Sequence, residues 1–300
     1  MSYSYFQENG YIIIENFIDE RLIDKVLHEL DLVKKTSNLF YSQNNHRVHK
    51  FNSCINDDGL LINSIQSPSK HLHLQGLRKS VLDVITAPSI TNLLQELTGS
   101  KSKLVLYQDM LFDRSTGTLD HRDTWYLDSK PRGAMNAIWI ALEDISSLSG
   151  PFHVYKGSNK TFCIDEVDEV YKSGTEEIAE KIISENKLLK VPAIIKKGTI
   201  LVWNSYTLHG SENPKDDFTS RKSITAHYYP IGERVNLEKN SIKSLKKDIK
   251  SLIPSQNSDL YILNSYENNR IRFMKDLFKR HLKDFWRKNL PPINPMQRSK

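Results

Sequence analysis

Cysteine is scarce in this chain, which contains only Cys54 and Cys163 among its 300 residues. Two cysteines argue against a disulfide framework of the kind that stabilises small secreted domains, and they favour a reducing compartment. Both are expected to be ordinary buried or surface thiols. The sequence therefore predicts a cytoplasmic protein.

Long apolar runs are absent as well. A transmembrane helix needs about twenty consecutive, mainly apolar residues, and because no run approaches that length, no membrane span is expected. The first residues contain neither the basic region nor the apolar region of a secretory signal. With 38% hydrophobic and 26% charged residues, the composition is that of a soluble globular protein with one large domain or two ordinary ones.

Positive charge is unevenly distributed along the chain. The formal net charge is +6, and residues 234–300 contain 16 Lys and Arg against 6 Asp and Glu. A basic segment can attract nucleic acid, anionic lipid or an anionic substrate, although it more often forms a solvated helix face. No zinc-finger spacing and no basic motif interleaved with aromatic residues is present, so nucleic acid is not an expected partner.

The first hundred residues have a mainly helical pattern. Residues 3–14 predict a short segment that runs into a strand, and Asp19 is a suitable N-cap for the helix that follows. Residues 41–75 are polar and irregular, and we interpret them as a loop or lid over a site. Apolar periodicity predicts helices over about 20–35, 76–86 and 89–98.

From about residue 103 the pattern changes to short alternating runs separated by Gly, Pro, Asn and Ser. These runs predict strands over 103–114, 134–142, 152–155, 191–195, 199–203 and 223–229. Many short strands of this kind are typical of a sandwich or jelly roll of two antiparallel sheets. The predicted fold class is therefore mostly β with flanking helices.

Two helices are predicted outside this pattern. One covers 175–186 with Thr175 as its cap, and the other is an amphipathic helix near 267–288. The apolar stripe of the second helix is expected to pack on the core or to form a dimer contact, and it consists of Ile271, Met274, Leu277, Phe278, Leu282 and Phe285. The expected organisation is one domain over 1–233, with a helical part at 1–100 and a jelly-roll core at 103–230, followed by a basic, largely helical extension at 234–300 packed on the core. Either a monomer or a homodimer is compatible with this pattern.

Three residues suggest a metal site. His121 and Asp123 are two positions apart, and residues at i and i+2 of a strand project to the same face. His209 completes the set if a second strand lies alongside the first. Two imidazoles and one carboxylate hold non-haem Fe(II) while leaving coordination positions open. Each piece is common and usually structural by itself, so the order of all the motifs decides the interpretation.

That order resembles the phytanoyl-CoA dioxygenase family of Fe(II)- and 2-oxoglutarate-dependent oxygenases over about residues 5–230. The matching segments are Phe6–Tyr11, His121–Asp123, Trp139–Leu142, Ser149–Phe152, Gly157–Lys160, Gly198–Trp203 and Leu208–Ser211. Asn159 stands where the family usually has histidine, a difference expected to be structural. The resemblance implies a double-stranded β-helix, that is, a jelly-roll or cupin-like sandwich, in which His121, Asp123 and His209 are the iron ligands and the catalytic residues.

The resemblance also implies a site for 2-oxoglutarate. Arg221 would form a bidentate pair with the distal carboxylate of this co-substrate, and Ser211 would donate a hydrogen bond to the same group. Gln108 and Trp139 would line the pocket. Three alternatives remain open from the residues alone: Trp139 as plain core, Gln108 as a surface strand residue, and Arg221 as an exposed turn residue.

The implied reaction uses Fe(II) with 2-oxoglutarate and O2 as co-substrates. It would hydroxylate an unactivated C–H bond of a small, anionic metabolite and release succinate and CO2. The alternatives are a desaturating or cyclising relative, and an oxygenase whose macromolecular or lipid-linked substrate docks on the basic C-terminal segment. Halogenation is not expected, because related halogenases replace the carboxylate that Asp123 supplies here.

Substrate contacts are expected next to the iron ligands. Arg114 precedes the His121–Asp123 pair, and the aromatic residues Trp125 and Tyr126 follow it. If Arg114 faces the pocket, the substrate is anionic, and the aromatic neighbours would favour an apolar or ring-bearing portion. Arg114 could equally pair with a nearby acid on the surface.

Overall fold

A computed structural model describes residues 2–127, 132–231, 252–263 and 270–289. The strands of the larger sheet are β1 (Tyr11–Ile14), β4 (Ile65–Gln66), β5 (Leu104–Phe112), β7 (Asn136–Ala141), β10 (Ile200–Asn204), β12 (Ser223–Pro230), β13 (Leu252–Pro254) and β14 (Leu260–Leu263). The smaller sheet contains β6 (Thr118–His121), β8 (Phe152–Tyr155), β9 (Lys190–Pro192) and β11 (His209–Ser211). A separate hairpin is formed by β2 (Leu39–Tyr41) and β3 (Val48–Lys50).

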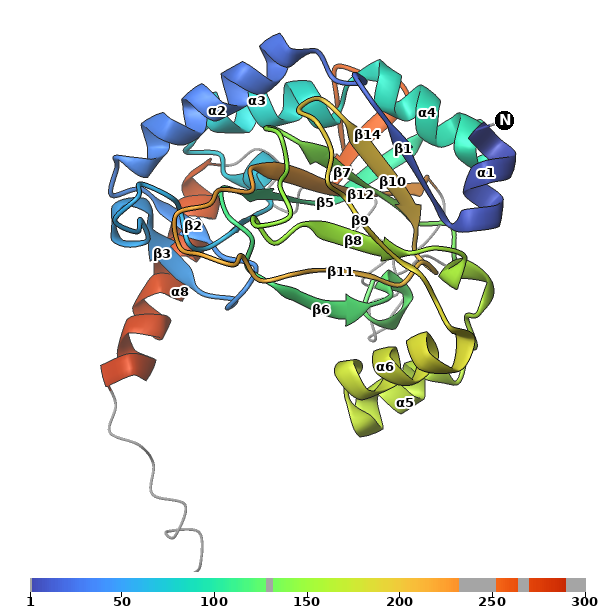
Figure 1. The fold of residues 1–300 in the computed structure, drawn as a ribbon. Coiled ribbons are helices and arrows are strands. Elements are labelled where there is room, and N and C mark those ends of the chain that lie inside the picture. The colour runs from blue at the N-terminus through green and yellow to red at the C-terminus, as the bar shows by residue number, and fades with distance from the viewer. Residues whose placement is uncertain (1, 128–131, 232–251, 264–269, 290–300) are drawn as a thin grey trace, which may run out of the picture.

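The two sheets face each other as a sandwich (Figure 1). The larger sheet has the order β1-β10-β7-β12-β5-β14-β13, with β4 also paired to β5, and the smaller has the order β6-β11-β8-β9. Every pairing is antiparallel except that of β14 with β5. The predicted sandwich of antiparallel sheets is confirmed, and each of the six predicted core strands is present within a few residues of its expected bounds.

The larger sheet contributes side chains to a hydrophobic cluster on each of its faces. Strand β7 shows this, because successive side chains of a strand point to opposite faces. Ile138 and Ile140 join the large core cluster beneath the helices, whereas Trp139 joins the cluster between the two sheets. Trp203 of β10 belongs to the same inner cluster. The inner face of the larger sheet therefore places two tryptophans toward the smaller sheet.

Helices cover the outer face of the larger sheet (Figure 1). The helices of the structure are α1 (Ser2–Asn9), α2 (Glu20–Lys34), α3 (Gln75–Ile85), α4 (Pro88–Thr98), α5 (Glu166–Ser173), α6 (Thr175–Asn186) and α8 (Arg270–Asn289). Three predicted helices are confirmed as α2, α3 and α4, and the Asp19 side chain caps α2 by accepting the Arg21 N–H. The predicted cap of α6 was wrong, because Gly174 occupies the N-cap and Thr175 is the first helical residue.

The C-terminal segment contributes to the sheet and to its surroundings. Strand β14 pairs with β5, and α8 packs on the β2–β3 hairpin. The packed side of α8 carries Phe273 and Leu277, whereas Ile271 and Phe278 of the predicted stripe are exposed. The side chain of Phe285, residues 267–269 and the predicted domain boundary at residue 233 lie outside the described part of the chain. Within that part, no helix is long and apolar enough to cross a membrane.

His71, in the segment between β4 and α3, is buried in its neutral form. Its Nδ1–H donates to the Ser67 carbonyl (2.9 Å), and its Nε2 accepts the Tyr41 N–H (3.2 Å). Only a neutral imidazole can do both, because a protonated ring has two donors and no acceptor. Burial lowers the pKa of His71 to about 3.

This environment predicts a pH-dependent stability. Below its unfolded pKa of about 6.5, His71 binds a proton in the unfolded chain but not in the folded one, so its contribution to stability is lost as the pH falls from about 7 towards 3. By pH 5 the loss should reach about 2 kcal/mol. Urea denaturation at pH 7 and pH 5 should show a smaller decrease for His71→Gln than for wild type. The exposed control His28→Gln should retain the wild-type decrease.

Candidate active site

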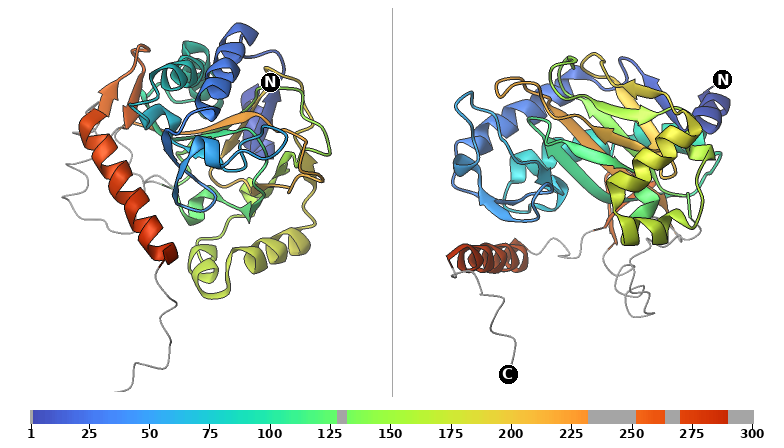
Figure 2. Two further views of the ribbon diagram at one scale, coloured as in Figure 1. Left: turned by 90° about the vertical axis from the view of Figure 1, so that its left-hand side faces the viewer. Right: turned by 60° about the horizontal axis from the view of Figure 1, so that its bottom comes forward.

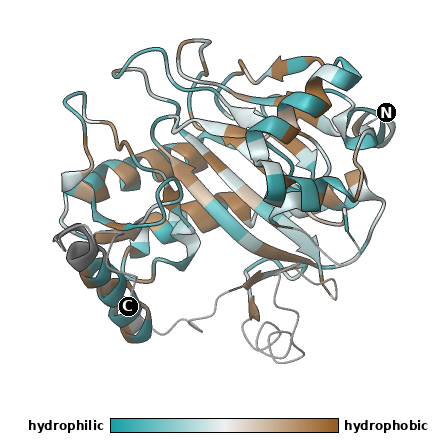
Figure 3. Ribbon diagram, turned by 90° about the horizontal axis from the view of Figure 1, so that it is seen from below, coloured by the Kyte–Doolittle hydropathy of each residue, from teal (hydrophilic) through white to brown (hydrophobic). Residues whose placement is uncertain are grey.

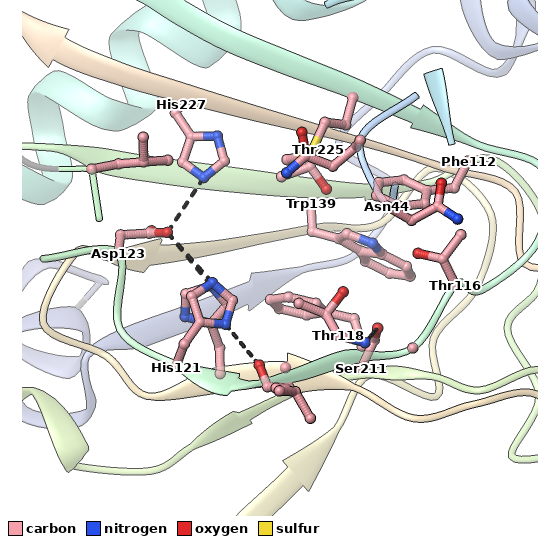
Figure 4. Close-up of a pocket in the computed structure, with 18 of the residues that line it drawn as sticks. Asn44, Phe112, Thr116, Thr118, His121, Asp123, Trp139, Ser211, Thr225 and His227 are labelled. Atoms are coloured by element: carbon pink, nitrogen blue, oxygen red, sulfur yellow. Dashed lines mark hydrogen bonds and ion pairs between the residues drawn. The ribbon is translucent and has the colours of Figure 1, made fainter. Parts of the chain in front are cut away.

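His121, Asp123 and His209 converge at one point between the sheets. Strand β11 pairs with β6, and this register places His209 directly opposite His121. One candidate ligand atom from each of the three residues lies within 4.8 Å of the others. Figure 4 shows His121 and Asp123 at one end of a pocket. The structure therefore brings together the three ligands expected from the sequence.

Asp123 is positioned by a turn and not, as predicted, by the strand that contains His121. Strand β6 ends at His121, and Asp123 begins the 3-10 turn η3 (Asp123–Trp125). His121 and Asp123 therefore do not share one face of a strand, and that prediction was wrong. Arg122, between them, is fully buried and forms an ion pair with Glu166, so its side chain fixes the turn that aims Asp123 inward.

Hydrogen bonds fix the orientation of each candidate ligand. His121 Nδ1 pairs with the Leu119 carbonyl at 2.8 Å, and His209 Nδ1 pairs with the Thr207 carbonyl at 2.9 Å. Because Nδ1 donates to these carbonyls, Nε2 of each ring carries the lone pair that can bind a metal. Asp123 Oδ2 accepts the Trp203 indole N–H at 3.0 Å, which leaves Oδ1 facing the imidazoles.

The electrostatics suit a divalent cation. Burial alone would raise the pKa of Asp123, but His209, His227 and His121 hold it well below its usual range. Burial, reinforced by His121, lowers the pKa of His209 to about 3. At neutral pH the site thus presents an ionised carboxylate and a neutral imidazole, which are the protonation states that metal binding requires. The residues present therefore fit Fe(II).

Arg221 lies in the same cavity, which has a volume of about 470 Å³. Its side chain is buried, so an exposed turn position is excluded, and its Nε has no hydrogen-bond partner among the described residues. The guanidinium carbon is 5.1 Å from the centre of the Phe112 ring and 5.8 Å from that of Trp139. Burial lowers the pKa of Arg221 to about 9. A buried cation of this kind needs an anionic partner, which a ligand carboxylate would provide.

The other residues expected around 2-oxoglutarate also line this cavity. Ser211 lines it, and its Oγ accepts the Thr118 N–H at 3.0 Å. Gln108 of β5 and Trp139 of β7 line it from the larger sheet. The Trp139 indole N–H is buried without a hydrogen-bond partner in the described structure. It is therefore a donor that a bound ligand could satisfy.

The three candidate substrate residues have different positions. Tyr126 lines the cavity, and its hydroxyl forms a hydrogen bond with Thr175. Trp125 does not line it, because its ring is buried beside α5 and α6 and its N–H donates to Glu166 at 3.1 Å. Arg114 is also outside the cavity lining and forms an ion pair with Asp217 at 2.6 Å. The surface-pair alternative for Arg114 is the one that the structure shows.

Two residues that contact Asp123 were not predicted from the sequence. His227 lies on β12 with its Nε2 3.6 Å from Asp123 Oδ1, and Trp203 holds the other oxygen of the same carboxylate. Strand alternation could have identified His227, because it is six residues after Arg221, and Thr225 between them also lines the cavity. The sequence does not indicate the role of Trp203, because an apolar residue in a strand usually belongs to the hydrophobic core.

We expect Trp203→Phe to weaken metal binding by about tenfold to a hundredfold, the usual effect of removing a hydrogen bond to a metal ligand. The substitution keeps an aromatic ring in the inner cluster but removes the donor that orients Asp123. Calorimetric titration with a divalent metal would measure the change. The matched control is Trp125→Phe, which removes an indole N–H that bonds to Glu166 outside the site. Equal affinities for Trp203→Phe and wild type would contradict the orienting role.

Comparisons with known proteins find relatives in one family. A family model described as phytanoyl-CoA dioxygenase (PhyH) matches residues 6–223. Human peroxisomal phytanoyl-CoA dioxygenase is 20% identical over 260 residues, which cover 82% of this chain and 72% of that protein. The Caenorhabditis elegans homolog of phytanoyl-CoA dioxygenase domain-containing protein 1 is 22% identical over 265 residues, covering 77% of this chain and 90% of its own.

Solved structures share the fold. The alpha ketoglutarate-dependent epimerase SnoN from nogalamycin biosynthesis superposes with a TM-score of 0.58 at 16% identity, covering 85% of this chain and 89% of its own. EctD from S. alaskensis with bound Fe has a TM-score of 0.53 at 17% identity, covering 78% of this chain and 77% of its own. These likenesses confirm the jelly-roll, cupin-like sandwich. Because the family model spans most of the sequence, the chain belongs to the phytanoyl-CoA dioxygenase family of Fe(II)- and 2-oxoglutarate-dependent oxygenases.

Proposed function

We propose that this enzyme hydroxylates an unactivated C–H bond of a small molecule, with 2-oxoglutarate and O2 as co-substrates. The observation that supports the proposal is the position of Arg221 in the cavity that also contains His121, Asp123 and His209. Fe(II) held by these three ligands would activate O2, so that 2-oxoglutarate becomes succinate and CO2 while the second oxygen atom enters the substrate.

The side chains around Arg221 prepare the site for a carboxylate. Arg221 would bind the distal carboxylate of 2-oxoglutarate, and the Ser211 hydroxyl, already held by the Thr118 N–H, would donate to it. The rings of Phe112 and Trp139 flank the guanidinium and exclude water from it. Removal of water strengthens the ion pair, because a charge interaction weakens as the surrounding dielectric rises.

The structure changes what we propose for the substrate. An anionic substrate was expected from Arg114, which instead pairs with Asp217 outside the cavity. Among the described residues that line the cavity, Arg221 is the single Lys or Arg, and the co-substrate occupies it in this proposal. The proposal therefore keeps a small-molecule substrate and drops the requirement that it be anionic.

Anaerobic addition of Fe(II) and 2-oxoglutarate should produce a weak charge-transfer band in the visible. Arg221→Gln should require about a hundredfold more 2-oxoglutarate for the same band, because it removes one partner of a buried charge pair. Arg114→Gln is the matched control and should leave the titration unchanged, since Arg114 lies outside the cavity. If folded wild-type protein binds Fe(II) but shows no band, the proposed use of 2-oxoglutarate is wrong.

The mass of the product separates the possible outcomes once a substrate is found by its effect on this band. Hydroxylation adds one oxygen, desaturation or ring closure removes two hydrogens, and epimerisation leaves the mass unchanged. Two structural neighbours are described as an epimerase and a carbocyclase, so the same fold supports outcomes other than hydroxylation. A product that lacks the added oxygen would overturn the proposed hydroxylation and leave the oxygenase class intact.

A further inference from the structure

Helix α8 is amphipathic, but only part of its apolar side contacts the rest of the molecule. Phe273 and Leu277 are buried in a cluster with Leu39 of β2 and Val48 of β3. Figure 2 shows α8, coloured red, at the edge of the molecule. The inner side of the helix is therefore fixed against the hairpin, and this packing determines which residues face outward.

Three large apolar side chains occupy the outer side of α8. Ile271, Phe278 and Leu282 are 69%, 54% and 42% exposed. Their spacings of seven and four residues place them on one side of the helix, in a stripe about 16 Å long. In Figure 3, α8 carries both hydrophobic and hydrophilic residues along its visible surface. Apolar side chains that gather on an exposed face indicate an interaction surface.

Lysines accompany this stripe. Lys275 lies between Ile271 and Phe278 on the helix, and Lys279 and Lys283 follow at successive intervals of four residues. The acidic group among the described side chains of α8, Asp276, forms an ion pair with Arg280. The outer side thus combines an apolar stripe with a row of positive charges.

We propose that the outer side of α8 binds the surface of a membrane that contains anionic phospholipid. Such a surface accepts apolar side chains at the boundary of its acyl region and attracts lysines through its headgroups. A second copy of the chain fits less well, because stacking this face on itself would place lysines near lysines. Nucleic acid would pair with the lysines but would leave Ile271 and Leu282 in water.

Docking through α8 would bring the active site close to the lipid. The helix packs on β2 and β3, and the connection between these strands supplies Gln43 and Asn44 to the lining of the catalytic cavity. A substrate that partitions into the membrane would therefore have a short path to that cavity. The proposed docking does not depend on the oxygenase reaction, and binding alone can test it.

Sedimentation of the full chain with vesicles provides the test. Binding to phosphatidylcholine vesicles that contain phosphatidylserine should exceed binding to phosphatidylcholine alone. Lys275→Glu combined with Lys279→Glu should weaken binding by roughly twentyfold or more, because each lysine near an anionic surface contributes about fivefold. Phe278→Ser combined with Leu282→Ser should weaken it as well. Inorganic phosphate added at constant ionic strength, which leaves charge screening unchanged, should not displace the protein.

Matched controls separate a local effect from loss of folding. Phe218→Ser changes a phenylalanine that is more exposed than Phe278 and lies on a loop rather than on α8. Lys172→Glu changes an exposed lysine of α5. Both should bind vesicles as wild type does, and circular dichroism should show the same helix content in every variant. The proposal is overturned if wild type binds neither kind of vesicle or both equally, if phosphate displaces it, or if the α8 variants retain full binding. It is also overturned if Phe278→Ser with Leu282→Ser instead converts a dimer into a monomer.

Discussion

Asp123→Ala should reduce succinate formation by about a thousandfold. The Oδ1 atom of Asp123 lies 4.0 Å from Nε2 of His121, 3.7 Å from that of His209 and 3.6 Å from that of His227. Asp123 supplies the negative charge of the ligand set, and its carboxylate lies at the centre of a buried cluster of imidazoles. Removing one partner from a buried charged group costs about 3–5 kcal/mol, and each 1.4 kcal/mol corresponds to about a factor of ten in binding.

Metal titration distinguishes loss of the ligand from loss of the fold. Asp123→Ala should bind Fe(II) weakly and show no visible band with 2-oxoglutarate, while its circular dichroism spectrum remains that of wild type. Asp144→Ala is a suitable control, because this carboxylate pairs with Lys196 on the surface. An Asp123→Ala variant that retains wild-type iron affinity would show that the three residues do not form the metal site.

Arg122→Met should have the largest effect on stability, about 3–5 kcal/mol. Arg122 is fully buried, and its Nε lies 2.9 Å from Glu166 Oε2. Its guanidinium also donates to the Ser158 carbonyl at 2.6 Å, to the Thr161 hydroxyl at 2.8 Å and to the Tyr206 carbonyl. Methionine fills a similar volume but leaves Glu166 as a buried charge without its cation.

Thermal unfolding of the metal-free protein would measure this loss as a decrease in Tm of roughly 6–15 °C. A second substitution, Glu166→Met, should recover part of the loss when combined with Arg122→Met, because it removes the uncompensated carboxylate. Arg21→Met is the control, since its pair with Asp19 is exposed and should contribute less than about 1 kcal/mol. Similar decreases for Arg122→Met and Arg21→Met would contradict the role assigned to the buried pair.

The metal ligands could be identified from the sequence because several weak motifs occur in a fixed order. His121, Asp123 and His209 are uninformative one at a time, but the glycine-led strand before His209 and the arginine after it restrict the interpretation. The long core strands were also predictable, since β5, β7 and β12 are long enough to show alternation. These features depend on local pattern, which a single sequence contains.

Other features depend on contacts between distant residues, which a single sequence does not contain. His227 contacts Asp123 across 104 positions. Alternation after Arg221 could place His227 in the cavity, but it does not indicate the contact with Asp123. Strands β6 and β11 are too short to show a period, so the pairing that joins His121 to His209 could only be assumed. Arg114 could have turned toward the cavity or the surface, and Asp217, on a distant loop, determines the choice.

The parallel pairing of β14 with β5 has a practical consequence for shortened forms of the chain. Leu260 and Ile262 of β14 are buried, and β14 covers the edge of β5 from Leu104 to Leu106. A truncation before β14 would leave that apolar edge with free backbone groups, which is a template for aggregation. A truncation placed after Leu263 would remove α8 and keep the edge protected.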